Sequence, residues 1–489
     1  MKQELRPYQK DALEQILKHY KKGERKVLLH LDTGAGKTTI FAEVLKRALD
    51  KGSSAIMVVR GRKLVGQASQ RLTRESIRHG VLMAGHHADF PNEPIQICSI
   101  DTVRSRGLLP KADIIVYDEA HMATSQSYHD FVKNYPSAYH LPVTATPYLD
   151  KSLRHIANVV VRPIGMKQLI EQGYLVKARY FAPTDVDLSG CRTQQTKDGI
   201  DYVIKDIEGV VNTGAIIGNL ADNFIKFSQD RSALIFAVSI RHSHAIVEEF
   251  KSKGIKIAHM DNKTKEKDRE RIIADLESGK IKAISNVGIL GTGVDIPSLG
   301  VIVFARPTKS LNLYLQIAGR GTRPFEGKND FIIIDCVGNI KEHGFITDEH
   351  HVDLDGKKKK KTEIKTKTCP SCFAIFLSAE TVCPECLFML PTRRGGGERE
   401  ATSGDGVIAE IHEETRTDKI SRASREVEAL IERQRKPKKG GGLIKPGWVF
   451  FRLKAKFGDD VARTVYKKIK SRLITEIVIN KDEDDDTLI

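Results

Sequence analysis

The chain has 489 residues, a net charge of +16, and a composition in which 40% of residues are hydrophobic and 29% are charged. This balance is typical of a soluble globular protein of roughly two to four domains, and it excludes an intrinsically disordered chain. No apolar run reaches the ~18 residues that a membrane span needs, and the first residues lack the apolar core of a secretory signal. The basic excess fits a polyanionic partner, and it equally fits a surface that only keeps the protein soluble.

Short apolar runs rich in β-branched residues alternate with amphipathic stretches in the first part of the chain. Residues 40–49, for example, place an apolar stripe on one face of a helix. The predicted strands are Val27–Leu31, Ala55–Val59, Ile95–Ile100, Asp113–Tyr117 and Tyr139–Thr144. Strands that alternate with helices predict a parallel sheet whose faces are covered by helices.

The same alternation returns in a second part of the chain. Its predicted strands are Ala233–Val238, Lys256–Met260, Ala283–Val287, Val301–Ala305 and Phe331–Asp335. The polar, glycine-containing segment 180–212 that precedes them is either a linker or a small insertion. We therefore expect an α/β fold with two domains of similar size, at residues 1–165 and 166–345.

The character of the sequence changes beyond the second domain. Residues 357–392 combine the lysine run Lys357–Lys361 with four cysteines, and residues 393–489 hold charged linkers, a small basic unit and an acidic tail. The acidic tail is either a recruiting site for a protein partner or a disordered solubilising end, and its composition favours the second.

The strongest chemical signal is a glycine-rich loop between the first predicted strand and a helix. It reads LDTGAGKTT at positions 31–39. The glycines let backbone N–H groups approach a phosphate, Lys37 would reach the β- and γ-phosphates, and Thr38 would hold Mg²⁺. The predicted ATP-binding residues are Thr33, Gly34, Ala35, Gly36, Lys37, Thr38 and Thr39. Leu31 stands where the general phosphate-loop pattern has glycine.

Two acidic residues, Asp118 and Glu119, follow directly after another predicted strand. A carboxylate at the carboxyl end of a parallel strand can face the phosphate loop across the switch point of the sheet. Asp118 is therefore predicted to bind Mg²⁺, and Glu119 to polarise the attacking water as a general base.

Four motifs in this order resemble those of superfamily 2 helicases. They are LDTGAGKTT, DEAH at 118–121, TATP at 144–147 and QIAGRGTR at 316–323. The resemblance covers residues 3–340 and implies two tandem RecA-like parallel-sheet domains that use ATP and Mg²⁺. Residues Leu31 and Asp32 depart from the family, which often has a small residue and proline there.

The resemblance also implies roles for single residues. An N-terminal glutamine reads adenine in this family, which points to Gln9 with Arg6 beside it. The histidine of DEAH and the threonines of TATP couple the nucleotide state to the grip on the nucleic acid, which points to His121, Thr144 and Thr146.

Two motifs of the second domain complete the predicted ATP site. The stretch NVGILGTGVDIP contributes Gly293 and Asp295, and QIAGRGTR contributes Gln316, Arg320 and Arg323. Arg323 matches the family's arginine finger, and Arg320 matches its partner. Their spacing predicts that both arginines lie on one helix face, where they would stabilise charge on the γ-phosphate.

Three further segments resemble motifs that contact the nucleic-acid backbone. They are GRKLVGQ at 61–67, SIDTVRSR at 99–106 and AVSIRHS at 237–243. The candidate nucleic-acid contacts within them are Arg62, Thr102 and Arg241.

Four cysteines form two tight pairs in the sequence CPSC-x10-CPEC. They are Cys369, Cys372, Cys383 and Cys386. Two such pairs at this separation are typical of a tetrahedral, structural Zn²⁺ site, and they indicate a reducing environment rather than a disulfide framework. A zinc ribbon beside a lysine run could contact DNA or a protein partner.

A motor core followed by a zinc ribbon resembles the RadD-like bacterial repair helicases and related phage-borne helicases. The resemblance implies a DNA helicase or translocase in repair, recombination or replication, acting on single-stranded or branched DNA. It implies a cytoplasmic location, in a bacterium or in the host of a phage.

Two other functions stay open at this point. An RNA helicase is one, because motor motifs mostly contact the backbone and discriminate RNA from DNA poorly. A non-catalytic DNA-binding adaptor is the other, although intact Lys37, Glu119 and Arg323 argue against it. The cluster of histidines and acids at 343–353 could also hold a nuclease metal, but its spacing follows no helix or strand and favours a polar loop.

Overall fold

The computed structural model describes residues 4–84, 92–148, 151–182, 186–196, 199–228, 230–289 and 296–356. It also describes the short segments 366–368, 375–377, 409–411 and 465–466, and residues 381 and 424. Among these residues, no helix combines the length and the apolar character needed to cross a bilayer.

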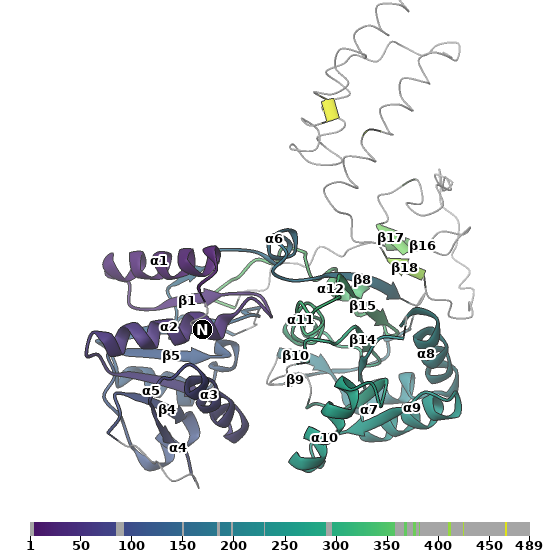
Figure 1. Ribbon diagram of the computed structural model, residues 1–489, viewed down its shortest axis with the longest axis horizontal. Coiled ribbons are helices and arrows are strands. Elements are labelled where there is room, and N and C mark those ends of the chain that lie inside the picture. The colour runs from purple at the N-terminus through teal and green to yellow at the C-terminus, as the bar shows by residue number, and fades with distance from the viewer. Residues whose placement is uncertain are drawn as a thin grey trace, which may run out of the picture. The chain divides into compact units, whose positions relative to one another are not determined.

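The first domain is built on a parallel sheet of seven strands (Figure 1). Its strands are β1 (Val27–His30), β2 (Ala55–Val59), β3 (Gly80–Leu82), β4 (Ile95–Ser99), β5 (Ile114–Asp118), β6 (Tyr139–Thr144) and β7 (Val159–Val161). They lie in the order β3-β4-β2-β5-β6-β1-β7. The helices are α1 (Pro7–Lys21), α2 (Lys37–Asp50), α3 (Arg62–Arg74), α4 (Ile100–Arg106) and α5 (Gln126–Lys133), with the short 3₁₀ helix η1 (Ala120–Met122).

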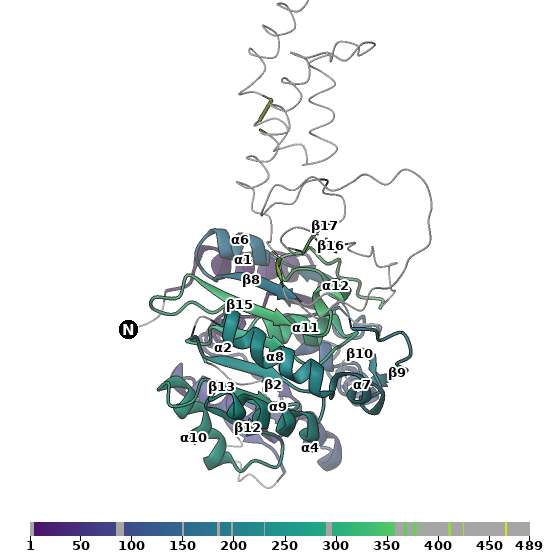
Figure 2. The ribbon, with the colours of Figure 1, turned by 90° about the vertical axis from the view of Figure 1, so that its right-hand side faces the viewer.

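The second domain is built on a mixed sheet of nine strands (Figure 2). Its strands are β8 (Lys177–Ala182), β11 (Ala233–Phe236), β12 (Ile257–Met260), β13 (Ala283–Asn286), β14 (Val301–Phe304), β15 (Asp330–Asp335), β16 (Thr366–Thr368), β17 (Ile375–Leu377) and β18 (Ala409–Ile411). The order is β12-β13-β11-β14-β15-β8-β18-β17-β16. The strands from β12 to β8 are parallel, and β18 joins β8 in the antiparallel direction.

Helices alternate with these strands along the second domain. They are α6 (Met166–Glu171), α7 (Ile204–Val211), α8 (Gly214–Phe227), α9 (Ile240–Ser252), α10 (Glu266–Glu277), α11 (Leu311–Ala318) and α12 (Asn339–His343). Helices α8 and α9 contact each other, α8 contacts β15, and α9 contacts β12 and β13.

The chain crosses between the two domains twice. The first crossing lies between β7 and β8. After α12 the chain returns to the first domain, where the carbonyl of Leu354 accepts a hydrogen bond from the Leu153 N–H at 2.8 Å. Arg154 forms two hydrogen bonds, of 2.9 and 3.2 Å, with the Asp355 carboxylate. Leu354 is buried in an apolar cluster of the first domain.

The prediction of two parallel α/β domains is confirmed, and each of the ten predicted strands corresponds to a strand of the structure within two residues at either end. The segment 180–212 contains the end of β8, an antiparallel hairpin of β9 (Thr193–Thr196) and β10 (Gly199–Tyr202), and all of α7. It is therefore a small structured insertion rather than a bare linker. Sequence reasoning missed the short strands β3 and β7 and the strands that extend the second sheet beyond β15.

Gly321 packs flat against the core of the second domain. A Cβ atom at this position would overlap the ring of Phe331, a fully buried residue at the start of β15. We expect Gly321→Ala to destabilise the protein by about 1–3 kcal/mol, because the ring has no free space to move into. The measurement is the midpoint of urea unfolding.

Gly66 supplies the matched control for this substitution. It lies inside α3, and a Cβ atom there would meet no other atom within 4 Å. Gly66→Ala should therefore be neutral or stabilising by up to about 1 kcal/mol through helix propensity. Equal unfolding midpoints for Gly321→Ala and wild type would contradict this account of the packing.

Candidate functional site

The loop between β1 and α2 has the backbone geometry of a phosphate cradle. Gly34 and Gly36 have φ angles of +88° and +78°, values that side-chain-bearing residues rarely adopt. Helix α2 begins at Lys37, so the first N–H groups of the helix point into the loop. These free donors and the helix dipole favour an anion at this position. Thr33 and Ala35 lie in the loop, and Thr38 and Thr39 lie in the first turn of α2.

Lys37 lies among three carboxylates. Its Nζ donates to the carbonyl of Leu31 at 3.4 Å. Burial lowers the pKa of Lys37, and the negative charges of Glu119, Asp118 and Asp32 oppose that shift. The Lys37 side chain therefore lies next to the glycine loop, where a phosphate would be bound.

Asp118 and Glu119 stand at the carboxyl end of β5, two strands away from β1 in the sheet. Burial, followed by the charge of Glu119, raises the pKa of Asp118 to about 6. The backbone N–H of Glu119 donates to Asp118 Oδ1 at 2.9 Å. Glu119 itself has a φ of +48°, a left-handed conformation that is costly outside glycine and is often found at functional sites.

A buried hydrogen-bond network connects the two domains behind these carboxylates. Gln316 Nε2 on α11 donates to Thr146 Oγ1 and to His121 Nε2, both at 3.1 Å. His121 Nδ1 lies 3.0 Å from Thr144 Oγ1 and 3.4 Å from Glu119 Oε2. The Gln316 amide nitrogen can only donate, so His121 Nε2 is the acceptor in this contact. The structure therefore brings the predicted coupling residues together with Gln316.

The end of α11 lies against the phosphate loop. A Cβ atom on Gly319 would lie 2.5 Å from Thr33 Cβ, so only glycine permits this approach. Thr322 Oγ1 lies 3.4 Å from the carbonyl of Thr33. Arg323 Cγ lies 3.7 Å from the position of a Cβ on Gly34, and the Arg323 charge is among the causes that lower the Lys37 pKa.

The prediction that Arg320 and Arg323 share one helix face is wrong. Helix α11 ends at Ala318. Arg320 lies in the turn that follows, and Arg323 lies directly after that turn. The helix stops because Gly319 and Gly321 form a turn that fits between Thr33 and the Phe331 ring. Arg323 approaches the phosphate loop from just beyond this turn, and the Arg320 side chain is buried.

The predicted adenine-reading residues lie at the other end of the phosphate loop. Gln9 Nε2 would lie 2.6 Å from a Cβ on Gly36, and its Oε1 accepts the Arg6 N–H at 3.0 Å. Two neighbouring tyrosines were missed from the sequence. Tyr8 Oη donates to the Ala35 carbonyl at 2.9 Å, and the Tyr174 ring lies 4.8 Å from the Arg6 guanidinium.

Asp32, the departure from the family pattern, is part of a buried polar cluster beneath the loop. Its carboxylate lies 3.6 Å from Arg162 Nη2 and 3.8 Å from His30 Nε2. Burial raises the pKa of Asp32, and the charges of Arg162 and Lys37 oppose the rise. Arg162 comes from the first crossing between the domains, so Asp32 ties that crossing to the phosphate loop.

Arg71 on α3 is a further residue that the sequence did not point to. Its Nη1 donates to Thr38 Oγ1 at 3.0 Å. Since the two residues are 33 positions apart, only the fold brings them together.

The three predicted nucleic-acid contacts have different surroundings. Arg62 is exposed at the start of α3. Thr102 is buried on α4, and its hydroxyl accepts the Ala84 N–H at 2.9 Å. Arg241 is exposed on α9, and its Nε donates to Glu208 at 3.0 Å.

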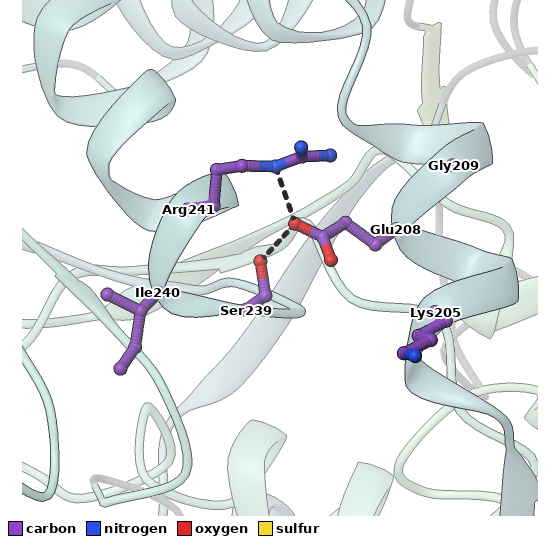
Figure 3. Close-up of a pocket in the computed structure, with 6 residues that line it drawn as sticks. All are labelled: Lys205, Glu208, Gly209, Ser239, Ile240 and Arg241. Atoms are coloured by element: carbon purple, nitrogen blue, oxygen red, sulfur yellow. Dashed lines mark hydrogen bonds and ion pairs between the residues drawn. The ribbon is translucent and has the colours of Figure 1, made fainter.

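Arg241 borders an open hollow of the second domain, which Figure 3 shows. Its lining residues are Lys205, Glu208, Gly209, Ser239, Ile240 and Arg241. The Glu208 carboxylate points toward both Ser239 and Arg241 and accepts the Ser239 hydroxyl at 2.7 Å (Figure 3).

Several predicted site residues lie outside the described part of the chain. These are Gly293 and Asp295 of the second domain and the cysteines Cys369, Cys372, Cys383 and Cys386. Among the residues that the structure does describe, no three histidines, cysteines or acids are grouped so that they could hold a metal ion. This includes the described histidines and acids of 343–353, where His343 Nε2 lies 2.8 Å from the carbonyl of Thr308.

Two protein families match successive parts of the chain. Residues 2–149 match the family described as "Type III restriction enzyme, res subunit", and residues 216–324 match the family described as "Helicase conserved C-terminal domain". The chain belongs to the superfamily 2 helicases. The helicase is accordingly a nucleic-acid-dependent ATPase, and its family implies ATP and Mg²⁺.

Known relatives extend this assignment. The helicase is 28% identical over 455 residues to a 51.5 kDa protein of a Lactococcus phage, covering 90% of this chain and 91% of the phage protein. It is 25% identical over 363 residues to a protein of Sulfurisphaera tokodaii named DNA 3'-5' translocase XPB2, covering 65% of this chain and 78% of that protein.

A solved structure supports the fold. The ATP-dependent Type ISP restriction-modification enzyme LlaBIII bound to DNA aligns with a TM-score of 0.54 at 18% sequence identity. The alignment covers 68% of the helicase and 28% of that enzyme. At this identity the likeness shows the shared tandem RecA-like fold.

The Gln316 network generates a prediction about coupling. Gln316→Met keeps the side-chain volume and removes the donor to His121 and Thr146. The second domain would then no longer respond to the nucleotide bound at the first. We expect nucleic-acid-stimulated ATP turnover to fall by about 10²-fold, while affinity for ATP changes little. The measurements are steady-state ATPase rates and equilibrium nucleotide binding.

A matched control is Gln15→Met on α1, where the glutamine bonds to Asp11 at the surface. This variant should turn over ATP like wild type. Turnover by Gln316→Met at the wild-type rate would show that the network carries no coupling.

Proposed function

We propose that this helicase couples ATP hydrolysis between its two domains to directed movement along DNA. The observation that supports this most is the convergence of Lys37, the Asp118–Glu119 pair and Arg323 at the glycine loop. These groups come from both domains, so a nucleotide bound there would be contacted from both sides. Hydrolysis and release would then change the contact between the domains.

The residues at the loop fit Mg²⁺ bound with ATP. A threonine hydroxyl and an aspartate carboxylate are the oxygen ligands that Mg²⁺ prefers beside phosphates. Thr38 and Asp118 supply them, and the Arg71 cation beside Thr38 indicates that this spot favours positive charge. The bound ion would neutralise charge on the phosphates, while Lys37 would contact the β- and γ-phosphates.

Glu119 and the two arginines would act during hydrolysis. The strained backbone of Glu119 projects its carboxylate from the end of β5, where it can orient a water for attack on the γ-phosphate. Arg323, and Arg320 behind it, would stabilise the charge that develops on the phosphate oxygens. His121, Thr144, Thr146 and Gln316 would transmit the outcome to the second domain.

We propose that DNA is the nucleic acid along which the helicase moves. The relative from Sulfurisphaera tokodaii is named a DNA translocase, which favours DNA over RNA. Arg62 and Arg241 are exposed cations at the starts of helices in the two domains, where they can contact backbone phosphates. We further propose single-stranded or branched DNA as the substrate, with a role in repair. The likeness to a phage protein supports the cytoplasm of a phage-infected or bacterial cell as the location.

The central test separates the motor from its alternatives. Wild-type ATP turnover is measured with single-stranded DNA, duplex, fork and RNA, beside the variants Lys37→Ala and Glu119→Gln. We expect DNA to stimulate wild type most, and both variants to lose about 10²-fold or more of this turnover. Glu119→Gln should retain ATP binding, because it keeps the size and shape of the side chain.

Each alternative has its own outcome in this test. Stimulation by RNA above every DNA substrate would favour an RNA helicase. Turnover at background with every nucleic acid would favour a DNA-binding adaptor. A Lys37→Ala protein that hydrolyses ATP at the wild-type rate would contradict the assignment of the glycine loop as the site that binds the ATP phosphates.

We also propose a structural zinc site at the four paired cysteines. The support is their spacing, CPSC followed by CPEC ten residues later, which suits four thiolates around one ion. In this site the ion would be fully enclosed by protein ligands, and it would contribute folding energy rather than chemistry.

Metal analysis tests the zinc proposal. The purified protein should contain about one zinc ion per chain, and the double variant Cys369→Ser/Cys372→Ser should contain almost none. The double variant Cys98→Ser/Cys191→Ser changes two cysteines outside the motif and should keep its zinc. Wild-type protein without zinc, or with equal zinc in both variants, would contradict the proposal.

A further inference from the structure

Arg71 links α3 to the first turn of α2 at one end of the candidate ATP site. Its guanidinium donates to Thr38 Oγ1 at 3.0 Å, and the side chain is half-buried. Thr38 is the first hydroxyl of α2 and lies next to Lys37. No sequence motif described above assigns Arg71 a role in the reaction.

The charge of Arg71 also acts on Asp118. Burial and the neighbouring Glu119 raise the pKa of Asp118, and Arg71 is the strongest of the cations that oppose the rise. Arg71 therefore interacts with the two residues, Thr38 and Asp118, that are proposed above to hold Mg²⁺. Lys37 adds a second positive charge that opposes the rise.

We propose that Arg71 is a positioning residue that stands in for Mg²⁺ while the site holds no nucleotide, and that it must release Thr38 when Mg²⁺ and ATP bind. The proposal rests on the function proposed above, since it takes Thr38 and Asp118 as the metal's ligands. Arg71 does not act on the phosphate itself. It keeps the Asp118 carboxylate and the Thr38 hydroxyl in place before the metal arrives.

Competition between Arg71 and the ion follows from geometry and charge. Mg²⁺ binds oxygen at 2.0–2.1 Å and demands near-ideal octahedral geometry. A guanidinium that donates to the same oxygen at 3.0 Å would lie beside a divalent cation, and like charges at such separations repel strongly in a partly buried site. The Asp118 carboxylate and the phosphates would hold the ion together, so Arg71 would be the group that moves.

Two opposite consequences follow for a protein without the Arg71 charge. Mg²⁺ no longer has to displace a resident cation, so it should bind at lower concentration. Without Mg²⁺, however, Asp118 and Glu119 lose a compensating charge, and they should repel the phosphates of free ATP more strongly. A purely structural role for Arg71 predicts neither of these opposite changes.

The experiment measures equilibrium binding of a fluorescent, non-hydrolysable ATP analogue to the full-length protein. The analogue is held at constant concentration while MgCl₂ is titrated, and a separate series contains EDTA. In Arg71→Gln we expect the Mg²⁺ concentration at half-maximal binding to fall by roughly three- to tenfold. We expect its affinity for the analogue in EDTA to fall by a similar factor.

Two further variants sharpen the test. Arg74→Gln removes an exposed arginine from the last turn of the same helix and should leave both values unchanged. Arg71→Lys keeps the positive charge and should restore most of the wild-type Mg²⁺ midpoint. Thermal unfolding of each variant checks that all are folded, and Arg71→Lys provides the comparison if Arg71→Gln is not.

The outcomes separate this inference from the function on which it rests. An unchanged or higher Mg²⁺ midpoint in Arg71→Gln, or a shift of equal size in Arg74→Gln, would overturn the role of Arg71. If Arg71→Gln does not fold, a Mg²⁺ midpoint in Arg71→Lys as low as threefold below wild type would overturn it, because the lysine keeps the charge. Wild-type protein that shows no Mg²⁺-dependent binding would instead overturn the proposed ATP site.

Discussion

The order of strands in the first sheet is the constraint on which the candidate site depends. Strands β5, β6 and β1 are neighbours, although the chain makes β1 first and reaches β5 and β6 much later. Because all three are parallel, their carboxyl ends meet at one edge of the sheet. The glycine loop after β1, the acidic pair after β5 and the threonines after β6 therefore face one another, and no local sequence property could achieve this.

The second domain completes the site through contacts that tolerate little change. Gly319 fits against Thr33 because it lacks a side chain. The amide of Gln316 connects His121 to Thr146 within a buried network, where each polar atom must find a partner. Close packing and hydrogen bonding together define a closed arrangement of the two domains, and a shift of either domain would break both at once. Such simultaneous loss of packing and hydrogen bonds suits a protein whose two domains alternate between discrete arrangements.

The sequence predicted the parts of this arrangement whose physics is local. Buried parallel strands are short β-branched runs, and phosphate loops need glycines at fixed spacing, so both could be recognised. The turn at Gly319 and Gly321 was taken for helix, because its shape is set by Thr33 and Phe331, which are distant in the chain. The contacts of Arg71 and Asp32 could not be predicted, because their partners Thr38 and Arg162 are brought to them by the fold. Strand β7 was missed because a three-residue apolar run carries too little pattern.

The return of the chain to the first domain at Leu354 has a mechanical consequence. A single connection between two domains permits rotation about many axes, whereas two connections restrict rotation mainly to the axis that passes through both. The crossing after β7 and the return near Leu354, held by Arg154 and Asp355, are such a pair. Rotation about the line through both attachments remains easy, and other rotations require the apolar anchor at Leu354 to be pulled out. The connections themselves thus select one direction of opening.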